Sequence, residues 1–133
     1  MRDDHALLAL RPAVPTQPGA LPAEAFQNDT LRPLLKLQHE LLVAAWHRYA
    51  TRNKGTFYRL GRPAQRDFLR HALQTNRELR SFLLGLACAL MTRAEWAAFR
   101  QNERELARRT YALAAERLLS DDAAFAPPPP ADA

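Results

Sequence analysis

The sequence predicts an all-α fold, a four-helix bundle-like single domain of two long and two short helices with flexible proline-rich tails at both ends. Three observations support this prediction. Eight of the ten prolines lie in two terminal zones, apolar residues between the zones recur every three or four positions, and two capping-box motifs lie in the same interval. We therefore expect a flexible tail over residues 1–27, a helical bundle domain over 28–120 and a disordered tail over 121–133.

Length and composition agree with one globular domain. The chain has 133 residues, of which 47% are hydrophobic and 25% charged, so it can bury one core and is too apolar for wholesale disorder. The longest apolar run, residues 82–91, is too short to cross a bilayer, which takes about 20 residues, and the first residues do not form a secretory signal. We expect a cytoplasmic protein without a membrane partner.

The first long helix is expected over about 30–52, because apolar residues form one stripe along it at helical spacing. Pro33 falls in its first turn, where the missing amide proton costs nothing. Asn53 and Gly55 tolerate positive φ and are typical of its end. A short second helix, over about 63–74, likewise begins at a proline and buries apolar residues on one side.

The third helix is expected over about 76–90. Thr75 and Glu78 match the reciprocal capping box at its start. Apolar residues occur on every side of its second half, which indicates a central helix with neighbours all around it. Gly85 and Ala89, four residues apart, would let another backbone approach closely.

The fourth helix is expected over about 93–119, starting at a second capping box of Thr92 and Glu95. At its full length it would extend to roughly 40 Å, about twice the length of the short helices. Either the first long helix or a second copy of the chain must cover the excess, and a symmetric dimer is the commonest form of the second solution. We expect a homodimer.

The sequence offers no constellation of catalytic residues. Its four glycines form no phosphate-binding loop, and its four histidines occur in no metal-binding pattern. Asp67 and His71 stand one helical turn apart, but no third ligand or nucleophile lies near them in the sequence, so a surface pair is the favoured interpretation. The lone Cys88 excludes a disulfide and a cysteine-based zinc site, and its apolar neighbours indicate a small core residue. The sequence predicts no enzyme, no cofactor and no metal site.

Positive charge is concentrated in one segment. The net charge is +5, and residues 48–80 contain nine basic side chains and two acidic ones, which gives this segment +7 and the rest of the chain −2. The loop 56–61 inside it interleaves two aromatic residues with arginine. We predict a partner-binding surface here, formed by Arg52, Lys54, Phe57, Tyr58, Arg59, Arg62, Arg66 and Arg70.

The arginine fork suits phosphates and carboxylates alike, so this surface admits two kinds of partner. Our main hypothesis is a non-enzymatic protein-interaction module, a regulator, adaptor or assembly factor that engages an acidic macromolecular partner. The alternative is a nucleic-acid-binding component of a regulatory or ribonucleoprotein complex that grips the backbone without sequence preference. A solvated helix face is also consistent with the arginines, and Phe57 and Tyr58 have the alternative role of capping the core.

Two further features bear on binding. A helix-turn-helix is disfavoured because the helix after the turn at 74–76 is apolar, whereas a recognition helix must present polar side chains to the bases. The leucine-rich residues 5–10, followed by a proline-broken spacer, are typical of a short segment that docks in another protein's groove. Plain disorder of this segment is the alternative.

Overall fold

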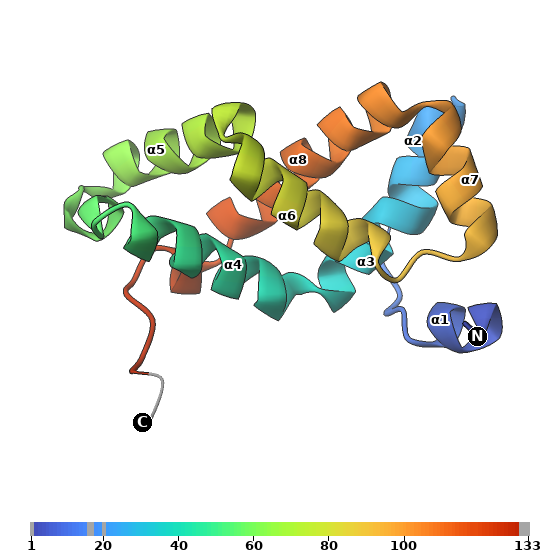
Figure 1. The fold of residues 1–133 in the computed structure, drawn as a ribbon, viewed down its shortest axis with the longest axis horizontal. Helices are drawn as coiled ribbons and strands as arrows, with labels where there is room; N and C mark the ends of the chain where they lie inside the picture. The colour runs from blue at the N-terminus through green and yellow to red at the C-terminus, as the bar shows by residue number, and fades with distance from the viewer. Residues whose placement is uncertain (1, 16–17, 20, 131–133) are drawn as a thin grey trace.

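The computed structural model describes residues 2–15, 18–19 and 21–130. Within these residues the chain forms helices and no strand, which confirms the predicted all-α class (Figure 1). Its α-helices are α1 (Asp4–Ala9), α2 (Pro22–Phe26), α3 (Arg32–Leu37), α4 (His39–Arg52), α5 (Arg62–Thr75), α6 (Arg77–Cys88), α7 (Arg93–Gln101) and α8 (Glu103–Leu119). Short helical segments of other types are the π-helical η1 (Gln27–Leu31) and the 3-10 helices η2 (Thr56–Arg59) and η3 (Asp122–Ala124).

The first predicted long helix is interrupted at Gln38. Its backbone (φ −93°, ψ 11°) leaves the helical region between α3 and α4, and its side-chain amide donates to the carbonyl of Leu86 in α6 at 3.1 Å. Upstream of α3 the helical path continues through η1 and α2 (Figure 1). The prediction of one helix over 30–52 is therefore wrong, because this polar side chain is fixed by a contact to a helix distant in the sequence.

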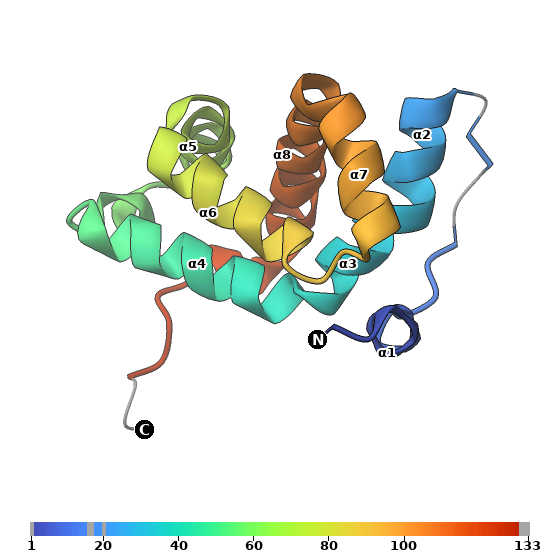
Figure 2. The same cartoon turned by 45° about the vertical axis from the view of Figure 1, so that its right-hand side comes forward.

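The second predicted long helix is broken at Asn102, whose backbone (φ −140°, ψ 46°) separates α7 from α8. Figures 1 and 2 show the two helices meeting at an angle at this residue range rather than continuing in one line. The expected helix of roughly 40 Å over 93–119 does not form. The described part of the chain therefore contains no overlong helix that a second copy would have to cover.

The core is built around Trp46 of α4, which is fully buried. Its ring meets the ring of Phe57 edge-on at a centroid distance of 4.9 Å. Among the helices, α6 packs against α4, α5 and α8, and α8 packs against α4 and α5. Phe99 of α7 is buried at the other end of the molecule, 6.4 Å from the ring of Phe26 in α2 (Figure 1). Removal of these apolar side chains from water is the main source of the stability of such a fold.

One face of α6 is open to solvent. The helix packs against α4, α5 and α8, but Phe82 on its outer face is 47% exposed. A Cβ added to Gly85 would meet no atom within 4 Å, so Gly85 and Ala89 do not bring another described helix close. The prediction of neighbours on every side of this helix is wrong for this face.

One of the two predicted capping boxes forms. Thr92 accepts from the amide of Glu95 and the Glu95 carboxylate accepts from the amide of Thr92, as expected. At the start of α6 the cap is instead Asn76, whose side chain accepts from the amide of Leu79 at 2.9 Å. The hydroxyl of Thr75 is turned back into α5, so the predicted box at this helix start is wrong.

The predicted N-terminal tail contains ordered structure. Figure 2 shows α1 beside the loop that joins α6 to α7, where Arg2 donates to the carbonyl of Ala89 at 2.8 Å. Further along, the buried side chain of Arg11 pairs with Glu95. The leucine-rich residues 5–10 lie mostly in α1, which buries none of its residues. The prolines of this region begin at Pro12, after this helix, so they do not interrupt it.

The first residues of the predicted C-terminal tail belong to the folded structure. Phe125 is buried, Trp46 donates through Nε1 to the carbonyl of Ala124 at 3.2 Å, and Gln65 donates to the carbonyl of Phe125 at 3.1 Å. Residues 127–130 are exposed and lead away from the helices (Figure 1). The predicted boundary after 120 thus falls inside packed structure, because buried donors on α4 and α5 require these carbonyls.

Candidate interaction surface

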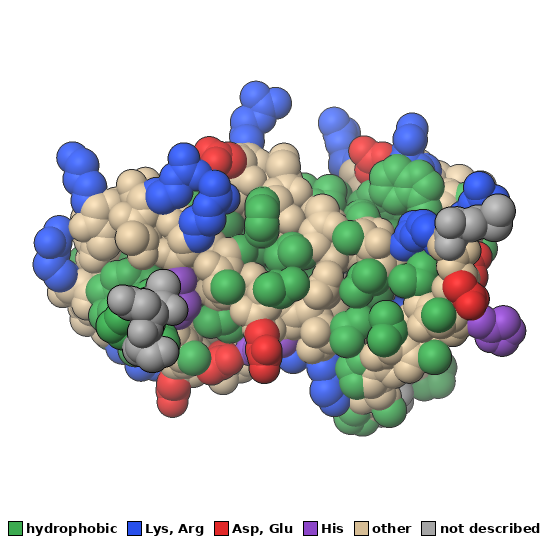
Figure 3. All heavy atoms as spheres, turned by 60° about the horizontal axis from the view of Figure 1, so that its bottom comes forward, with side chains coloured by type: hydrophobic (Ala, Val, Ile, Leu, Met, Phe, Trp, Pro, Cys, Tyr) green, Lys and Arg blue, Asp and Glu red, His purple; other side chains and the backbone are tan. Residues whose placement is uncertain are grey.

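The basic segment 48–80 forms one end of the molecule. It covers the C-terminal end of α4, the residues around η2, α5 and the start of α6, in the left half of Figure 1. Figure 3 shows Lys and Arg side chains projecting at the same end. Three of its nine basic side chains pair with carboxylates, namely Arg52 with Glu78 at 3.4 Å, Arg62 with Asp122 at 3.2 Å and Arg70 with Asp67 at 4.0 Å. The other six have no carboxylate partner among the described residues: Arg48, Lys54, Arg59, Arg66, Arg77 and Arg80.

The three ion pairs at this end are weak. Each carboxylate is largely exposed and each guanidinium is about half exposed. Exposed pairs of this kind contribute about 0–1 kcal/mol, because water and salt screen the attraction. An incoming carboxylate or phosphate can therefore replace any of these partners at little cost, and the positive charge of this end is available for binding.

The two aromatic residues predicted to contact a partner are part of the core. Phe57 is fully buried, with its ring centroid 6.0 Å from that of Phe125. The hydroxyl of Tyr58 lies 2.6 Å from Nδ1 of His47, and burial raises the pKa of this phenol so that it stays a donor. Phe57 and Tyr58 thus have the core-capping role and are not available for stacking on bases or on a partner's ring.

The predicted surface arginines of α5, Arg62, Arg66 and Arg70, have different neighbours. The guanidinium of Arg62 lies over the ring of Phe125 at 4.2 Å and beside Asp122, where it holds the C-terminal segment. Arg66 is half-buried without a hydrogen-bond partner in the described chain, and Arg70 borders a groove toward α8. Their contacts differ, although the spacing of four residues keeps all three on one side of α5.

Two of the predicted cations, Lys54 and Arg59, are exposed in and next to η2. Lys54 is exposed and has φ 66°, next to Gly55 with φ 64°, which makes a tight left-handed turn after α4. Arg59 is exposed and donates only a long hydrogen bond of 3.5 Å to the hydroxyl of Thr56. Both side chains can therefore form an ion pair with an anionic group of a partner.

A groove between α4 and α6 combines basic side chains with an apolar floor. It has a volume of about 510 Å³, with Arg48 and Arg52 on its α4 wall and Phe82 on its α6 wall. The guanidinium of Arg48 lies 5.9 Å from the centre of the Phe82 ring. Sequence reasoning missed Arg48 and Phe82, since an apolar helix without visible neighbours gives no sign of which face stays open. The remaining lining residues are Ala45, Tyr49, Asn53, Asn76, Glu78, Leu79 and Ser81.

Residues considered for chemistry lie apart. Asp67 faces Arg70, and no hydrogen bond joins it to His71 within the described chain. Burial, with a smaller contribution from the charge of Glu103, raises the pKa of the Cys88 thiol to about 11, so it stays protonated at neutral pH. Among the described residues no three His, Cys, Asp or Glu side chains gather at one point. In the same part of the chain, no helix combines the length and the hydrophobicity needed to cross a bilayer.

The groove between α4 and α6, together with the cations around η2, is the candidate interaction surface of the described chain. Comparison of the sequence with protein-family models and with curated proteins, and comparison with solved structures, finds no match.

Proposed function

We propose that this protein is a non-enzymatic interaction module that binds an acidic, amphipathic segment of a partner protein in the groove between α4 and α6. In this role it acts as a regulator, adaptor or assembly factor. The observation that carries the proposal is the combination of an exposed aromatic ring, Phe82, with arginines along the opposite wall of the groove.

The apolar part of the groove supplies affinity. The ring of Phe82 and the side chains of Tyr49 and Leu79 lie along it, and covering apolar surface stabilises a complex by roughly 25 cal/mol per Å². An aliphatic or aromatic side chain of the partner would remove this surface from water. A nucleic-acid backbone has no such group to offer, so the floor favours a peptide.

The charged wall supplies selectivity. Arg48 and Arg52 are four residues apart on α4 and so project from the same side of the helix, about one turn apart. A partner helix with two acidic residues at the same spacing can pair with both. Glu78 is the one acidic residue in the lining and contacts Arg52 only at 3.4 Å, so a partner carboxylate replaces it readily.

The test uses a synthetic amphipathic peptide of about 15 residues, with leucines on one side and glutamates four residues apart on the other. We expect saturable binding in fluorescence anisotropy at low salt and no binding of a matched peptide with lysines in place of glutamates. Changing Arg48→Glu and Arg52→Glu together should weaken binding at least about tenfold, since like charges then face each other.

The matched control reverses two other exposed arginines, Arg93→Glu and Arg104→Glu, which have no carboxylate partner in the described chain and lie on α7 and α8. This variant carries the same net charge as the α4 variant. Equal loss of peptide binding in the two variants would mean that net charge, and not the groove, attracts the peptide. Equal binding of acidic and basic peptides would also count against the proposal.

A second candidate function is binding of a nucleic-acid backbone without sequence preference. The observation in its favour is the set of cations without carboxylate partners at the end of α4 and around η2, which includes Lys54 and Arg59. An electrophoretic shift assay with a single-stranded oligonucleotide tests it. Binding that falls steeply with salt and is lost in a Lys54→Glu, Arg59→Glu variant would favour this function over peptide docking.

A further inference from the structure

We propose that a second groove, between α5, α6 and α8, binds a phosphoryl group through Arg70, Arg80 and Arg108. This groove has a volume of about 250 Å³ and is lined by these three arginines, Tyr111 and a small apolar floor. It shares no lining residue with the groove between α4 and α6, so the two sites can be tested separately. The floor and rim are completed by Leu73, Gln74, Ala112 and Ala115.

Arg80 is the fixed centre of this site. Its guanidinium lies 4.2 Å from the centre of the Tyr111 ring, which holds it by a cation–π contact. None of its nitrogens has a hydrogen-bond partner in the described chain, and its Nε is fully buried. Buried donors of charged groups are seldom left unpaired, because the lost hydrogen bond is not replaced by water. Nη1 and Nη2 are not fully buried, and they are the donors that an acceptor in the groove can reach.

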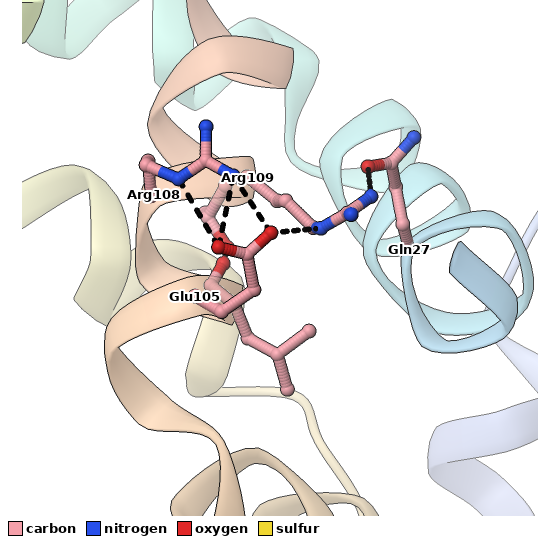
Figure 4. Close-up of polar contacts among 6 residues, drawn as sticks. Gln27, Glu105, Arg108 and Arg109 are labelled. Carbon is pink, nitrogen blue, oxygen red and sulfur yellow. Dashed lines mark hydrogen bonds and ion pairs between the residues drawn. The ribbon is translucent and has the colours of Figure 1, made fainter. Parts of the chain in front are cut away.

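Arg108 is oriented by a neighbour and still has a free donor. Its Nε and Nη2 donate to the carboxylate of Glu105 at distances from 2.7 to 3.2 Å, whereas Nη1 has no partner among the described residues (Figure 4). Glu105 also accepts from Arg109, which in turn donates to Gln27. One carboxylate thus serves two arginines and leaves a net positive charge at the edge of the groove.

Arg70 completes a set of three cations around one small space. Its only ionic partner in the described chain is Asp67, at 4.0 Å and largely exposed. Three guanidinium groups bordering one groove repel one another, and an anion between them removes this cost. The apolar floor of Leu73, Ala112 and Ala115 lowers the water content of the groove, which strengthens a charge-assisted hydrogen bond there.

The geometry favours a phosphoryl group over a carboxylate. A carboxylate has two oxygens in one plane and satisfies a single arginine fork, whereas a phosphoryl group presents three oxygens that can face arginines from three helices at once. Its charge of about −1.5 to −2 at neutral pH also matches several cations. Inorganic phosphate and a phosphate ester of a small organic molecule share this chemistry, and the apolar floor provides contact for the organic part of an ester.

The experiment titrates the full chain with three probes at low salt, followed by amide shifts in two-dimensional NMR. The probes are inorganic phosphate, phenyl phosphate and benzoate. We expect saturable shifts at Ala112 and Ala115 with both phosphates, tighter binding of phenyl phosphate if an ester is the natural ligand, equal binding if free phosphate is, and no saturation with benzoate. Arg80→Gln should weaken phosphate binding about tenfold or more.

Two further variants make the result specific. Arg70→Gln removes an exposed arginine of the groove without touching the core and should also weaken binding, whereas Arg77→Gln removes an exposed arginine of α6 outside the groove and should not. The proposal is overturned if neither phosphate saturates, if benzoate binds as tightly as phenyl phosphate, or if Arg77→Gln weakens binding as much as Arg70→Gln does. None of these outcomes depends on whether the acidic peptide binds between α4 and α6.

Discussion

The imidazole of His47 is hydrogen-bonded at both nitrogens, with Nδ1 2.6 Å from the hydroxyl of Tyr58 and Nε2 2.9 Å from the carbonyl of Ala123. A carbonyl only accepts, so Nε2 carries the proton and Nδ1 accepts from the phenol. Both contacts are therefore made by the neutral ring. This arrangement joins α4 to η2 and to the C-terminal segment, and burial lowers the pKa of His47 in spite of the hydrogen bond to the backbone.

The lowered pKa of His47 makes stability depend on pH. Below the ordinary value of 6.5 the unfolded chain binds a proton at this residue and the folded chain does not, so stability is full above that pH and falls as the pH drops toward the folded pKa. We expect urea midpoints between pH 8 and 5 to decrease in the wild type and to decrease less in His47→Gln. His71→Gln, at an exposed position, should follow the wild type, and a pH profile unchanged by His47→Gln would contradict this assignment.

Gln65 holds two backbone carbonyls inside the core. Its Nε2 donates to the carbonyls of Phe57 and Phe125, both at 3.1 Å. Gln65→Met keeps the length of the side chain but leaves the buried carbonyl of Phe125 without this donor, while the carbonyl of Phe57 keeps its hydrogen bond from the amide of Leu60. We expect the free energy of unfolding to fall by about 1–3 kcal/mol in urea denaturation. Gln74→Met on the same helix is exposed and should change it by less than about 0.5 kcal/mol. If the two changes lowered the free energy of unfolding by similar amounts, the hydrogen bonds from Gln65 to these carbonyls would not contribute to stability.

The C-terminal segment has two parts with different importance for stability. A chain ended after Ala126 loses residues 127–133, of which 127–130 are exposed prolines, whereas a chain ended after Ser120 also loses buried Phe125 and the acceptors of Trp46 and His47. We expect the first to melt like the full chain and the second to lose about 3 kcal/mol or more. Thermal unfolding followed by circular dichroism distinguishes the two, and equal melting of both truncated chains would refute this difference.

Glu95 of α7 holds the segment that follows α1, because its carboxylate pairs with Arg11. Burial alone would raise its pKa, but hydrogen bonds from Arg11 and Thr92 together lower it, and the side chain of Arg11 is only 8% exposed. Glu95→Gln leaves this arginine without its counter-charge, and we expect a loss of about 3 kcal/mol in chemical denaturation. Glu103→Gln breaks the exposed pair with Arg100 and serves as control, with an expected loss under about 1 kcal/mol. Equal losses would mean that the Arg11 pair is as weak as a surface pair.

Helix content was predictable because it depends on local signals. The apolar spacing, the prolines at helix starts and the Thr92 cap all act within a few residues. The breaks were not predictable, because Gln38 leaves the helical region where its amide reaches Leu86, 48 residues away. The cap at Asn76 shows the same limit on a smaller scale, since two adjacent residues both suit the cap and packing selects between them.

The basic end was predictable from the sequence, but the contacts of its individual side chains were not. The count of charges in 48–80 indicates where cations concentrate, yet it does not show that Arg62 is bound to Phe125 and Asp122 or that Phe57 is buried. Both facts depend on residues 122–125, which we predicted to belong to a disordered tail because a run of prolines follows them. The two grooves could not be predicted either, because each combines residues from helices that are distant in the sequence.

The packing of residues 123–125 against the helices also affects when the chain can complete its folding during translation. Trp46, His47 and Gln65 leave the ribosome 60 to 78 residues before the carbonyls that accept their protons. Until those carbonyls emerge, the interior between α4 and α5 is unfinished and its donors are open to water. Nascent chains that stop near Ser120 should therefore be cut rapidly by proteases, and protection begins only when Phe125 has emerged from the ribosome.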